Sequence, residues 1–373
     1  MNFDLTEDQR LVIDAVSRYL TREYSLAERA AATSGNSRHW QALAEQGMFA
    51  LPFEERYGGG GGGWNDVALV MQEFGKALLN EPYLASIVFP GALIQAGASE
   101  LQKQEILPRI IDGSVRFAVA YEEVSSAYDP TRIDTTFSEA EGEGGYVLNG
   151  RKKGILAGNF DVLIVLARRG DDFRLFMVPT GSPGVGLVTH PSVDGAAVSE
   201  ATFSNVRVPA GALLGDGRET LRHLELALDI ARIGLCAEAV GIMESMIRDT
   251  AEYARTRKQF GVPIGSFQAL QHKLVDMFVH AEQAKSSVWR ALAFVDDEAG
   301  RAQACASAKA LVGIGARFVG QQAIQIHGGM GMTEEMGISH FFRRLTAIEQ
   351  TLGNAAYHLR RVARQVSREP ALS

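Results

Sequence analysis

The chain has 373 residues, of which 46% are hydrophobic and 22% charged, and its formal net charge at pH 7 is −7. This length predicts two or three packed lobes, and the composition is ordinary for a globular protein. The acidic balance argues against nucleic acid as the main partner, because phosphate binding needs a basic surface. No apolar run approaches the roughly 18 residues of a membrane span. Acidic residues stand near the N-terminus, where a signal peptide is basic, so we expect a cytoplasmic chain that binds no membrane.

The ligand-type residues do not predict a metal site. Cys236 and Cys305 both lie in apolar helical pattern, which indicates buried free thiols. The eight histidines are scattered, and neither CxxC nor HxxxH nor HExxH spacing occurs.

Residues 1–113 carry apolar side chains at the spacing that is typical of helices. The first helix begins after Thr6, which forms a predicted capping box with Gln9. Six glycines run from Gly58 to Gly63, and no Lys-Ser/Thr pair follows them, so we expect a flexible turn and not a phosphate-binding loop. Further helices are predicted over residues 37–47, 66–79, 82–97 and 99–112.

The period of the pattern changes near Arg116. Short segments rich in Val, Phe, Leu and Tyr are then separated by glycine-rich turns, which predicts an antiparallel sheet or small barrel joined by hairpins. The predicted strands cover residues 116–121, 145–149, 161–168, 173–178 and 200–208. The predicted turns lie at residues 141–144, 149–150 and 181–184.

After Gly211 the helical period returns and holds to the end of the chain. Long helices with short connections predict an up-down four-helix bundle. These helices are expected over residues 217–256, 266–298, 302–325 and 339–369. The fold class is therefore α+β multidomain, with a helical domain at 1–114, a β-sheet domain at 115–213 and a helical bundle at 214–373. A sheet between two helical lobes can form clefts for a long ligand.

Two short stretches have the chemistry of a contact with an anionic, planar ligand. In the stretch 255–273, Arg257 could hold a pyrophosphate by forked hydrogen bonds, and Phe260 could cover an aromatic ring. The alternative is a solvated turn whose basic residues complete a helix C-terminus. In the stretch 325–332, Gly328 and Gly329 would let the backbone approach a ligand closely, or would simply end a helix.

Taken together, these pieces resemble the acyl-CoA dehydrogenases over essentially the whole chain. The order of helices, sheet and helices matches that family. Within it, the chain is most similar to the bacterial small subunits of pimeloyl-CoA or steroid side-chain dehydrogenases. The matching motifs are LTEDQR at 5–10, the glycine-rich stretch at 43–59, GYVLNGRK at 145–152, RKQFG at 257–261, Phe267-Gln268, and Gln325 with Gly328-Gly329.

The resemblance implies FAD as the cofactor, shared between subunits of a dimer or a tetrameric dimer of dimers. It implies that Arg257, Gln259 and Phe260 reach the pyrophosphate and adenosine of a neighbouring subunit's FAD. The other implied cofactor contacts are Ile264, Phe267, Gln268, Gln325, Gly328, Gly329, Tyr121 and Ser126. In this alignment Tyr121-Glu122 takes the place of Thr-Glu in the family motif TEPxxGSD. The implied partners are an acyl-CoA, a homologous subunit or a second copy, and an electron-transfer flavoprotein.

The chain departs from the family at the catalytic base. The usual glutamate position corresponds to Leu352, and the alternative position on the first bundle helix corresponds to Ala231, so neither carries a carboxylate. The residues Glu349, Asp229 and Glu238 lie nearby, but a structural or surface role is the simpler interpretation. The Trp and Thr that pack on the flavin correspond to Gly154 and Leu156, and Arg232 is the candidate substrate contact. The catalytic residue is thus unassigned.

Three functions remain open. The first is FAD-dependent α,β-dehydrogenation of an acyl-CoA thioester to the 2-enoyl-CoA by a heteromeric enzyme whose base lies on a partner chain. The second is a self-sufficient homo-oligomeric dehydrogenase with a relocated base. The third is a structural or CoA-binding homologue without redox activity. The sequence leaves the acyl group undetermined.

Overall fold

The computed structural model describes residues 4–33, 38–140 and 144–366. Residue 37 of a predicted helix, residues 141–143 of a predicted turn and residues 367–369 of the last predicted helix lie outside this part of the chain. The chain divides into two compact units. Unit 1 comprises Met1–Ala30, Trp64–Leu79 and Arg232–Ser373, and unit 2 comprises Ala31–Gly63 and Asn80–Ala231. The predicted three-part division at residues 114 and 213 stays a prediction.

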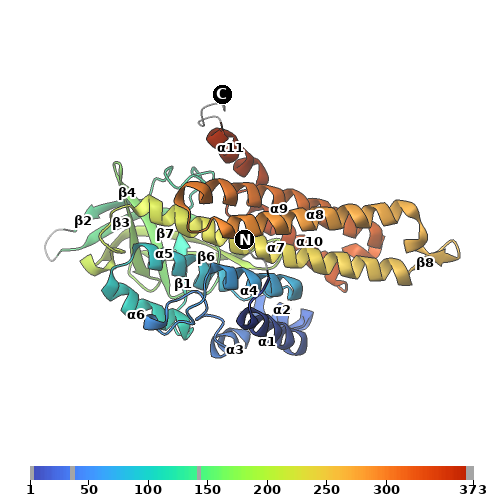
Figure 1. The fold of residues 1–373 in the computed structure, drawn as a ribbon. Helices are drawn as coiled ribbons and strands as arrows, with labels where there is room; N and C mark the ends of the chain where they lie inside the picture. Colours follow the sequence, from blue (N-terminus) through green and yellow to red (C-terminus); the bar gives the residue numbers. More distant parts are fainter. Residues whose placement is uncertain (1–3, 34–37, 141–143, 367–373) are drawn as a thin grey trace, which may run out of the picture. The chain divides into compact units, whose positions relative to one another are not determined.

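Unit 1 is helical. Its first helix, α1 (Glu7–Glu23), begins after Thr6, whose hydroxyl accepts a hydrogen bond from the Gln9 backbone while the Gln9 side chain accepts one from the Thr6 backbone. The predicted capping box is therefore confirmed. Its other helices are α4 (Trp64–Ala77), α7 (Thr220–Thr256, within unit 1 from Arg232), α8 (Gln268–Ala293), α9 (Glu298–His327), α10 (Gly337–Gln350) and α11 (Ala355–Val366) (Figure 1).

Glycines bring α4 and α7 into backbone contact. A Cβ atom on Gly75 would come within 2.1 Å of the Glu238 carbonyl oxygen, and one on Gly241 would come within 1.9 Å of the Gln72 carbonyl oxygen. Because any side chain at either position would collide with backbone, the helices can pack this closely only through glycine. This contact joins an N-terminal helix to the C-terminal bundle within unit 1.

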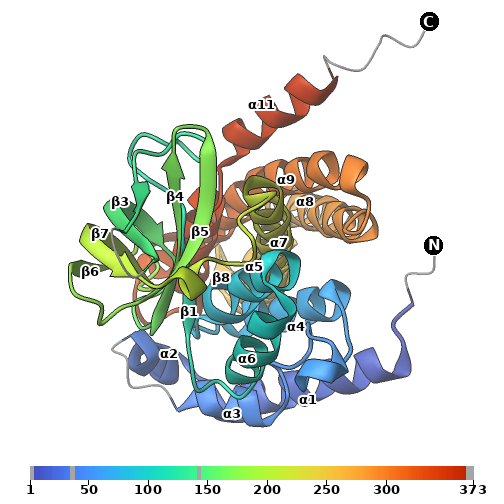
Figure 2. The same cartoon turned by 90° about the vertical axis from the view of Figure 1, so that its left-hand side faces the viewer.

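The helices α8 and α9 lie side by side and leave apolar side chains on their outer surfaces (Figures 1 and 2). Each of these side chains is between 44% and 58% exposed: Val275, Phe278 and Val279 on α8, and Leu311 and Ile314 on α9. A cluster of large exposed apolar residues is characteristic of a surface that another chain covers.

Unit 2 is built around a seven-stranded sheet with the order β1-β4-β2-β3-β7-β6, and β5 pairs with β4. Its core lies between side chains such as Phe137, Leu163 and Phe176, all buried. The strands are β1 (Phe117–Ala120), β2 (Thr136–Glu139), β3 (Tyr146–Ile155), β4 (Val162–Arg169), β5 (Asp172–Pro179), β6 (Val185–Pro191) and β7 (Ala197–Val208). The short helices of unit 2 are α3 (His39–Glu45), α5 (Phe89–Gly97) and α6 (Glu100–Ile111), and α2 (Leu26–Thr33) spans the boundary between the units.

The sheet corrects two details of the sequence analysis. It is mixed and not antiparallel, because β1 pairs with β4 in parallel. The chain passes through a long loop, β2 and β3 between them, so no hairpin can join them. The Asn149-Gly150 pair does not form a turn. It lies inside β3 at a register shift, and a Cβ atom on Gly150 would come within 2.4 Å of the Thr135 hydroxyl.

The glycine run of unit 2 forms a packed turn. Gly58 has φ of 85°, and a Cβ atom on Gly59 would come within 2.0 Å of the Phe53 carbonyl oxygen. The prediction of a turn instead of a phosphate loop agrees with this arrangement. The helix predicted over residues 82–97 begins as a π-helical turn (Leu84–Val88) and continues as α5.

The last predicted helix, over residues 339–369, is broken in two. α10 ends at Gln350 and α11 begins at Ala355. Between them Leu352 has φ of 57° and Gly353 has φ of 105°, so the backbone leaves the helical region. The predicted single helix was therefore wrong at Leu352, the position that the resemblance aligns with the family's usual base.

Candidate functional site

A short hairpin follows α7, and six of the residues predicted to contact a cofactor lie in it or beside it: Arg257, Gln259, Phe260, Ile264, Phe267 and Gln268. Its strands are β8 (Lys258–Gln259) and β9 (Val262–Pro263), and its tip holds Phe260 and Gly261 with φ of 54° and 82°. The Phe260 ring is 92% exposed and meets the Phe267 ring edge-on, with ring centroids 6.3 Å apart. The exposed ring therefore offers apolar surface to which another molecule could bind.

The polar residues of the hairpin are also accessible. The Arg257 guanidinium and the Gln259 and Gln268 amides are exposed, whereas Ile264 is buried beneath them. The Ile264 backbone N–H donates to the Arg257 carbonyl oxygen at 2.8 Å, which closes the loop at its base. Ile264 thus supports the hairpin, and its predicted cofactor contact stays a prediction.

The end of α9 lies against the end of α7. The His327 ring stacks on the Tyr253 ring at a centroid distance of 4.3 Å, and Tyr253 is one helical turn before Arg257. Burial lowers the pKa of His327, and its Nδ1–H donates to the Ala323 carbonyl oxygen at 2.9 Å. This histidine is a packed structural residue, and it connects the two predicted contact stretches.

The glycine turn after His327 is open. Gly328 has φ of 62°, and Cβ atoms built on Gly328 and Gly329 meet no atom within 4 Å. Gln325 beside them is exposed, and Met330 and Met332 are 47% and 69% exposed. The turn therefore presents accessible backbone and apolar side chains, which suits close approach of a ligand or a second chain.

The loop between α10 and α11 is held by buried cationic side chains. The Lys309 ammonium donates to the carbonyl oxygens of Ile348 at 2.9 Å, Glu349 at 3.2 Å and Gly353 at 2.9 Å. The Arg232 Nε donates to the Leu352 carbonyl oxygen at 3.1 Å. Positive charge at a helix C-terminus is favourable, so these cations stabilise the C-terminal end of α10.

His358 completes this arrangement from α11. Its Nε2 lies 3.1 Å from the Leu352 carbonyl oxygen, as a donor in the tautomer that fits the acceptor. Burial and then the neighbouring charges of Arg232 and Lys309 lower the pKa of His358 to about 2, so the ring is neutral at physiological pH. Arg232 itself is fully buried, and its predicted substrate contact stays a prediction.

The nearby carboxylates have structural partners. Glu238 forms a two-pronged ion pair with Arg344, at 2.6 Å and 2.8 Å. Glu349 accepts from Arg317 at 3.3 Å and from the Ala355 backbone at 3.3 Å, which caps the start of α11. Asp229 is fully buried.

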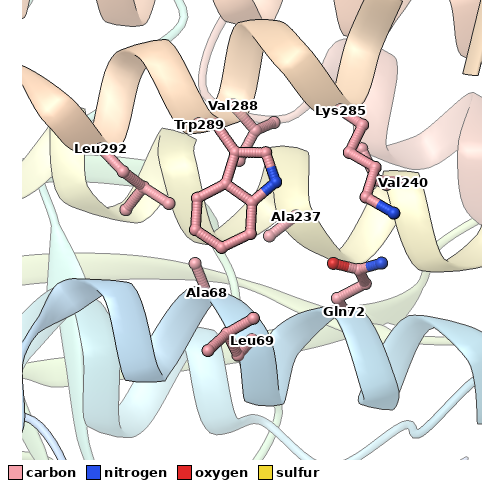
Figure 3. A pocket seen from close by; sticks show the side chains of 9 residues that line it. All are labelled: Ala68, Leu69, Gln72, Ala237, Val240, Lys285, Val288, Trp289 and Leu292. Atoms are coloured by element: carbon pink, nitrogen blue, oxygen red, sulfur yellow. The ribbon is translucent and has the colours of Figure 1, made fainter. Parts of the chain in front are cut away.

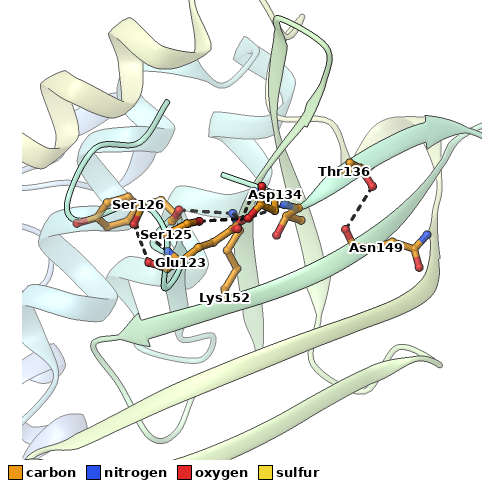
Figure 4. Close-up of polar contacts among 9 residues, drawn as sticks. Glu123, Ser125, Ser126, Asp134, Thr136, Asn149 and Lys152 are labelled. Atoms are coloured by element: carbon orange, nitrogen blue, oxygen red, sulfur yellow. Dashed lines mark hydrogen bonds and ion pairs between the residues drawn. The ribbon is translucent and has the colours of Figure 1, made fainter. Parts of the chain in front are cut away.

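The loop after β1 in unit 2 contains a buried ion pair (Figure 4). The Glu123 carboxylate accepts from the Lys152 ammonium at 2.6 Å, and from the Asp134 and Thr135 backbones at 2.7 Å and 3.1 Å. Despite its burial, these donors hold the pKa of Glu123 below its ordinary value. Burial lowers the pKa of Lys152 to about 8. The pair fixes the loop on β3.

The predicted cofactor residues of this loop are turned inward. Ser126 is fully buried, and its hydroxyl donates to the Glu123 carbonyl oxygen at 2.8 Å. Tyr121 is buried and meets the Phe89 ring edge-on at 6.0 Å. The sequence alone does not show that these side chains are buried, because a motif match says nothing about which side chains pack into the core.

Glu122 points away from that ion pair. Burial raises the pKa of its carboxyl, and the nearest charged group among the described residues is the Lys153 ammonium at 3.9 Å. A Cβ atom on Gly154 would lie 3.4 Å from the Glu122 Oε2. Its raised pKa makes Glu122 a candidate for proton transfer.

Unit 1 also contains a small pocket. It is lined by apolar side chains of α4, α7 and α8, including Leu69, Val240 and Trp289, with Gln72 and Lys285 at its polar end (Figure 3). In the described part of the chain there is no group of three His, Cys, Asp or Glu residues that could hold a metal ion. No described helix is long and apolar enough to cross a membrane.

Comparison with known proteins supports one family. Sequence models of the acyl-CoA dehydrogenase N-terminal and C-terminal domains match residues 6–114 and 221–367. A probable acyl-CoA dehydrogenase, YngJ of Bacillus subtilis, is 31% identical over 98% of this chain and 100% of its own length. The chain belongs to the acyl-CoA dehydrogenase family. The resemblance, the fold class and the enzyme class predicted from the sequence are thereby confirmed.

Other members and neighbours extend the likeness. Acryloyl-CoA reductase (NADH) of Anaerotignum propionicum is 31% identical over 98% of this chain and 96% of its own length. Butyryl-CoA dehydrogenase of Megasphaera elsdenii superposes with a TM-score of 0.89 at 26% identity, over 99% of this chain and all of that chain. The ChsE4-ChsE5 complex of Mycobacterium tuberculosis has the same fold, with a TM-score of 0.89 at 23% identity over the full length of both chains.

The structure favours a different register for the acyl-CoA dehydrogenase motif TEPxxGSD. If Glu123 is the motif's Glu, Asp129 falls on its Asp and Ala127 falls on its Gly. Ala127 has φ of 45°, the left-handed conformation that a glycine adopts readily. The sequence alignment had used Tyr121-Glu122 for Thr-Glu, one residue earlier. In the later register Glu122 stands at the motif's Thr.

Proposed function

We propose that the chain is one subunit of a heteromeric acyl-CoA dehydrogenase that uses FAD and carries its catalytic base on a partner chain. The overall reaction converts an acyl-CoA thioester to the 2-enoyl-CoA: the α-proton leaves to the base and the β-hydrogen leaves as hydride. Electrons then pass to an electron-transfer flavoprotein. The observation that carries the proposal is the pairing of an exposed contact hairpin with a base position occupied by Leu352.

The hydrogen-bond donors and the aromatic ring of the hairpin match chemical groups of FAD. Arg257 offers a forked guanidinium for a pyrophosphate, Gln259 offers an amide, and Phe260 offers a ring for an adenine. The open backbone at Gly328 and Gly329 admits close approach. When bound, FAD supplies the acceptor for the hydride. Because the hairpin projects its side chains into solvent, its FAD would be held mainly by another chain.

The loop between α10 and α11, here called the base loop, is consistent with a subunit that lacks its own catalytic base. Leu352 is 3% exposed, and the cations Lys309 and Arg232 hold the loop carbonyls around it. A carboxylate base must remain free to change its protonation state in a dry pocket. Glu349 and Glu238 are instead committed to ion pairs. This supports a base supplied by the partner.

The decisive experiment is co-expression of the chain with each homologous acyl-CoA dehydrogenase chain of its source, followed by FAD analysis of the purified complex. We expect an α2β2 assembly with one FAD for each pair of chains, active with an acyl-CoA and an electron-transfer flavoprotein. The chain alone should retain little FAD and show no dehydrogenation. Rapid turnover by the purified homo-oligomer would contradict the proposal.

A self-sufficient homo-oligomer is the second candidate, and Glu122 is the observation that favours it. Burial raises the pKa of its carboxyl, and it faces Gly154, where the family packs a large aromatic side chain on the flavin. If the homo-oligomer is active, Glu122→Gln should abolish dehydrogenation while FAD stays bound. Glu349→Gln is the matched control. If the complexes with every homologue contained no FAD and showed no redox activity, the third function would remain, that of a CoA-binding homologue without redox activity.

A further inference from the structure

A groove in unit 1 lies between α1, α4 and α8 and takes no part in the proposed function. Its volume is about 510 Å³, within the range of about 300–1,000 Å³ that is typical of small-molecule sites. Ile13 of α1, Leu69 of α4 and the Trp289 ring of α8 form its apolar wall. The groove therefore has both the size and the apolar surface that a small ligand needs.

The polar wall of the groove carries charges of both signs in a row. The Lys285 ammonium donates to Glu244 Oε1 at 3.0 Å, and the Gln72 amide donates to both oxygens of that carboxylate. The Lys76 ammonium lies 3.5 Å from Glu244 Oε2 and donates to Glu73 Oε1 at 2.6 Å. Despite its burial, these donors hold the pKa of Glu244 below its ordinary value, so the row stays ionised. Two lysines and two glutamates give this row no net charge.

Two polar atoms of the groove have no hydrogen-bond partner in the described part of the chain. They are Glu73 Oε2 and the indole Nε1 of Trp289, and neither is sealed from solvent. Trp289 and Lys285 are four residues apart, so they share one face of α8. Figure 3 shows the indole nitrogen on the side of the ring toward Lys285 and Gln72. The groove thus offers a free anionic acceptor beside Lys76 and a free donor beside Lys285.

This arrangement selects a ligand that carries both charges. An ammonium group would bind Glu73 Oε2, and a carboxylate would accept from the Lys285 ammonium and the Trp289 N–H. A ligand with a carboxylate alone would bring like charge against Glu73, and a ligand with an ammonium alone would bring like charge against Lys285. A zwitterion leaves the row neutral and meets both free atoms.

The small pocket of Figure 3 adjoins the groove and shares Leu69 and Trp289 with it. Its inner wall is apolar and includes Ala68, Val240 and Val288. Its volume is about 10 Å³, roughly the space of one water molecule. It therefore admits a group the size of a methyl and excludes an aromatic ring. Filling it with a methyl group is favourable, because apolar surface is removed from water.

From these features we infer that the groove between α1, α4 and α8 binds an α-amino acid with a branched aliphatic side chain. The ammonium meets Glu73, the carboxylate meets Lys285 and Trp289, and the branched end enters the small pocket. The inference goes beyond the proposed function and does not rest on it. All of these residues belong to unit 1, and none was predicted to contact the cofactor or the substrate.

Fluorine NMR of the full-length chain labelled with 5-fluorotryptophan tests the site directly, because the chain has three tryptophans. The Trp289 signal, assigned with Trp289→Phe, should shift saturably with L-leucine at a Kd of about 1 mM, as expected for so small a ligand. The signal of Trp40, buried in unit 2, should stay in place and is the internal control. An unmoved Trp289 signal at ten times that leucine concentration would overturn the inference.

Matched analogues of leucine test the chemistry of the ligand. 4-Methylpentanoate lacks the ammonium, 3-methylbutylamine lacks the carboxylate, and L-alanine lacks the branched end. Each should bind about tenfold more weakly than L-leucine or worse, because each loses one set of contacts. If either singly charged analogue bound as well as leucine, the zwitterion site would be overturned. Equal binding of L-phenylalanine would overturn the assignment of the side chain.

One variant with a matched control tests the residues. Glu73→Gln keeps the size of the side chain and removes its charge, so L-leucine should bind about tenfold more weakly. Glu252→Gln disrupts a pair of the same i,i+3 spacing, with Arg255 on α7, and should leave leucine binding unchanged. Circular dichroism melting verifies that both variants are folded. Unchanged leucine binding by the folded Glu73→Gln variant would overturn the inference.

The outcomes distinguish the inference from the proposed function. An active FAD-containing heteromer whose Trp289 signal ignores L-leucine overturns the amino-acid site and leaves the proposed function intact. A chain that binds L-leucine with the expected analogue preferences, but forms no heteromer with any homologue, supports the site and overturns the proposed function.

Discussion

The Arg232 Nε donates to the backbone carbonyl of Leu352 at 3.1 Å, inside unit 1. One partner is the residue predicted to meet the substrate, and the other stands where the resemblance would place the catalytic base. Through this hydrogen bond both residues belong to one cluster of polar contacts, which also includes the Lys309 ammonium and the His358 ring. In this member of the family the base loop is therefore anchored from three sides through its carbonyl oxygens.

Replacing Arg232 by Met should lower the free energy of unfolding by about 2 kcal/mol, the usual range for a buried hydrogen bond from a charged donor. Urea denaturation of the purified chain measures this change. Arg248→Met on the same helix is the control, because Arg248 is 67% exposed and its removal should cost less than about 0.5 kcal/mol. Unchanged stability with weaker acyl-CoA binding by the complex would instead support the substrate role predicted from the family.

Lys309 should make the stability depend on pH in the alkaline range. Burial, only partly offset by nearby negative charge, lowers its pKa from 10.5 to about 8. The unfolded chain therefore binds more protons than the folded chain between pH 8 and 10.5, so this group makes the unfolding free energy rise across that window, by up to about 3 kcal/mol. Below pH 8 the lysine is charged in both states and its unfavourable burial is fully present.

The neighbouring Cys236 acts in the opposite direction. Burial raises the pKa of its thiol from 9 to about 12, so this group makes stability fall as pH rises through that interval. The contribution of Lys309 is isolated by comparing the chain with Lys309→Met, in the presence of reductant, by urea denaturation at pH 7.5, 8.5, 9.5 and 10.5. The difference in unfolding free energy between the two should grow with pH in favour of the unmodified chain. A constant difference would contradict a lowered lysine pKa.

The Glu123–Lys152 pair should show the energetics of a buried ion pair. Removing one partner leaves an uncompensated buried charge, so Lys152→Met alone should cost about 3–5 kcal/mol of unfolding free energy. The double variant E123L/K152M removes both charges and should recover much of that loss. Thermal denaturation of the three proteins measures this coupling. Equal loss in the single and double variants would mean that the backbone hydrogen bonds to Glu123 matter more than its ion pair.

The helices of the bundle could be predicted because their apolar residues keep one period over many turns. The capping box at Thr6 and Gln9 has a local sequence signature and was found for the same reason. The strands β2 and β6 were missed, since both are short or exposed and lack an apolar alternation. The parallel pairing of β1 with β4 depends on long-range topology that no local pattern records.

The candidate-site residues that belong to sequence motifs could be named from the sequence, whereas the buried residues around them could not. The hairpin residues Arg257 and Phe260 were singled out by their motif; the structure shows them exposed, and their cofactor contact stays a prediction. Lys152 and Lys309 were not singled out, because lysine is normally a surface residue and their acceptors come from distant segments. The turn at Leu352 was missed because a left-handed leucine is rare and has no sequence signal.

Phe260 gives a test in which stability and cofactor binding should separate. Its ring is 92% exposed, so Phe260→Ala should change the unfolding temperature of the chain very little. In the complex with the homologous partner, the same variant removes the aromatic surface offered to the cofactor, and we expect FAD retention after gel filtration to fall severalfold. Val262→Ala, at a 40% exposed position on the same hairpin, controls for simple loss of apolar area. The FAD-to-protein absorbance ratio measures retention. Full retention in the Phe260 variant would show that the hairpin tip contacts protein and not the cofactor.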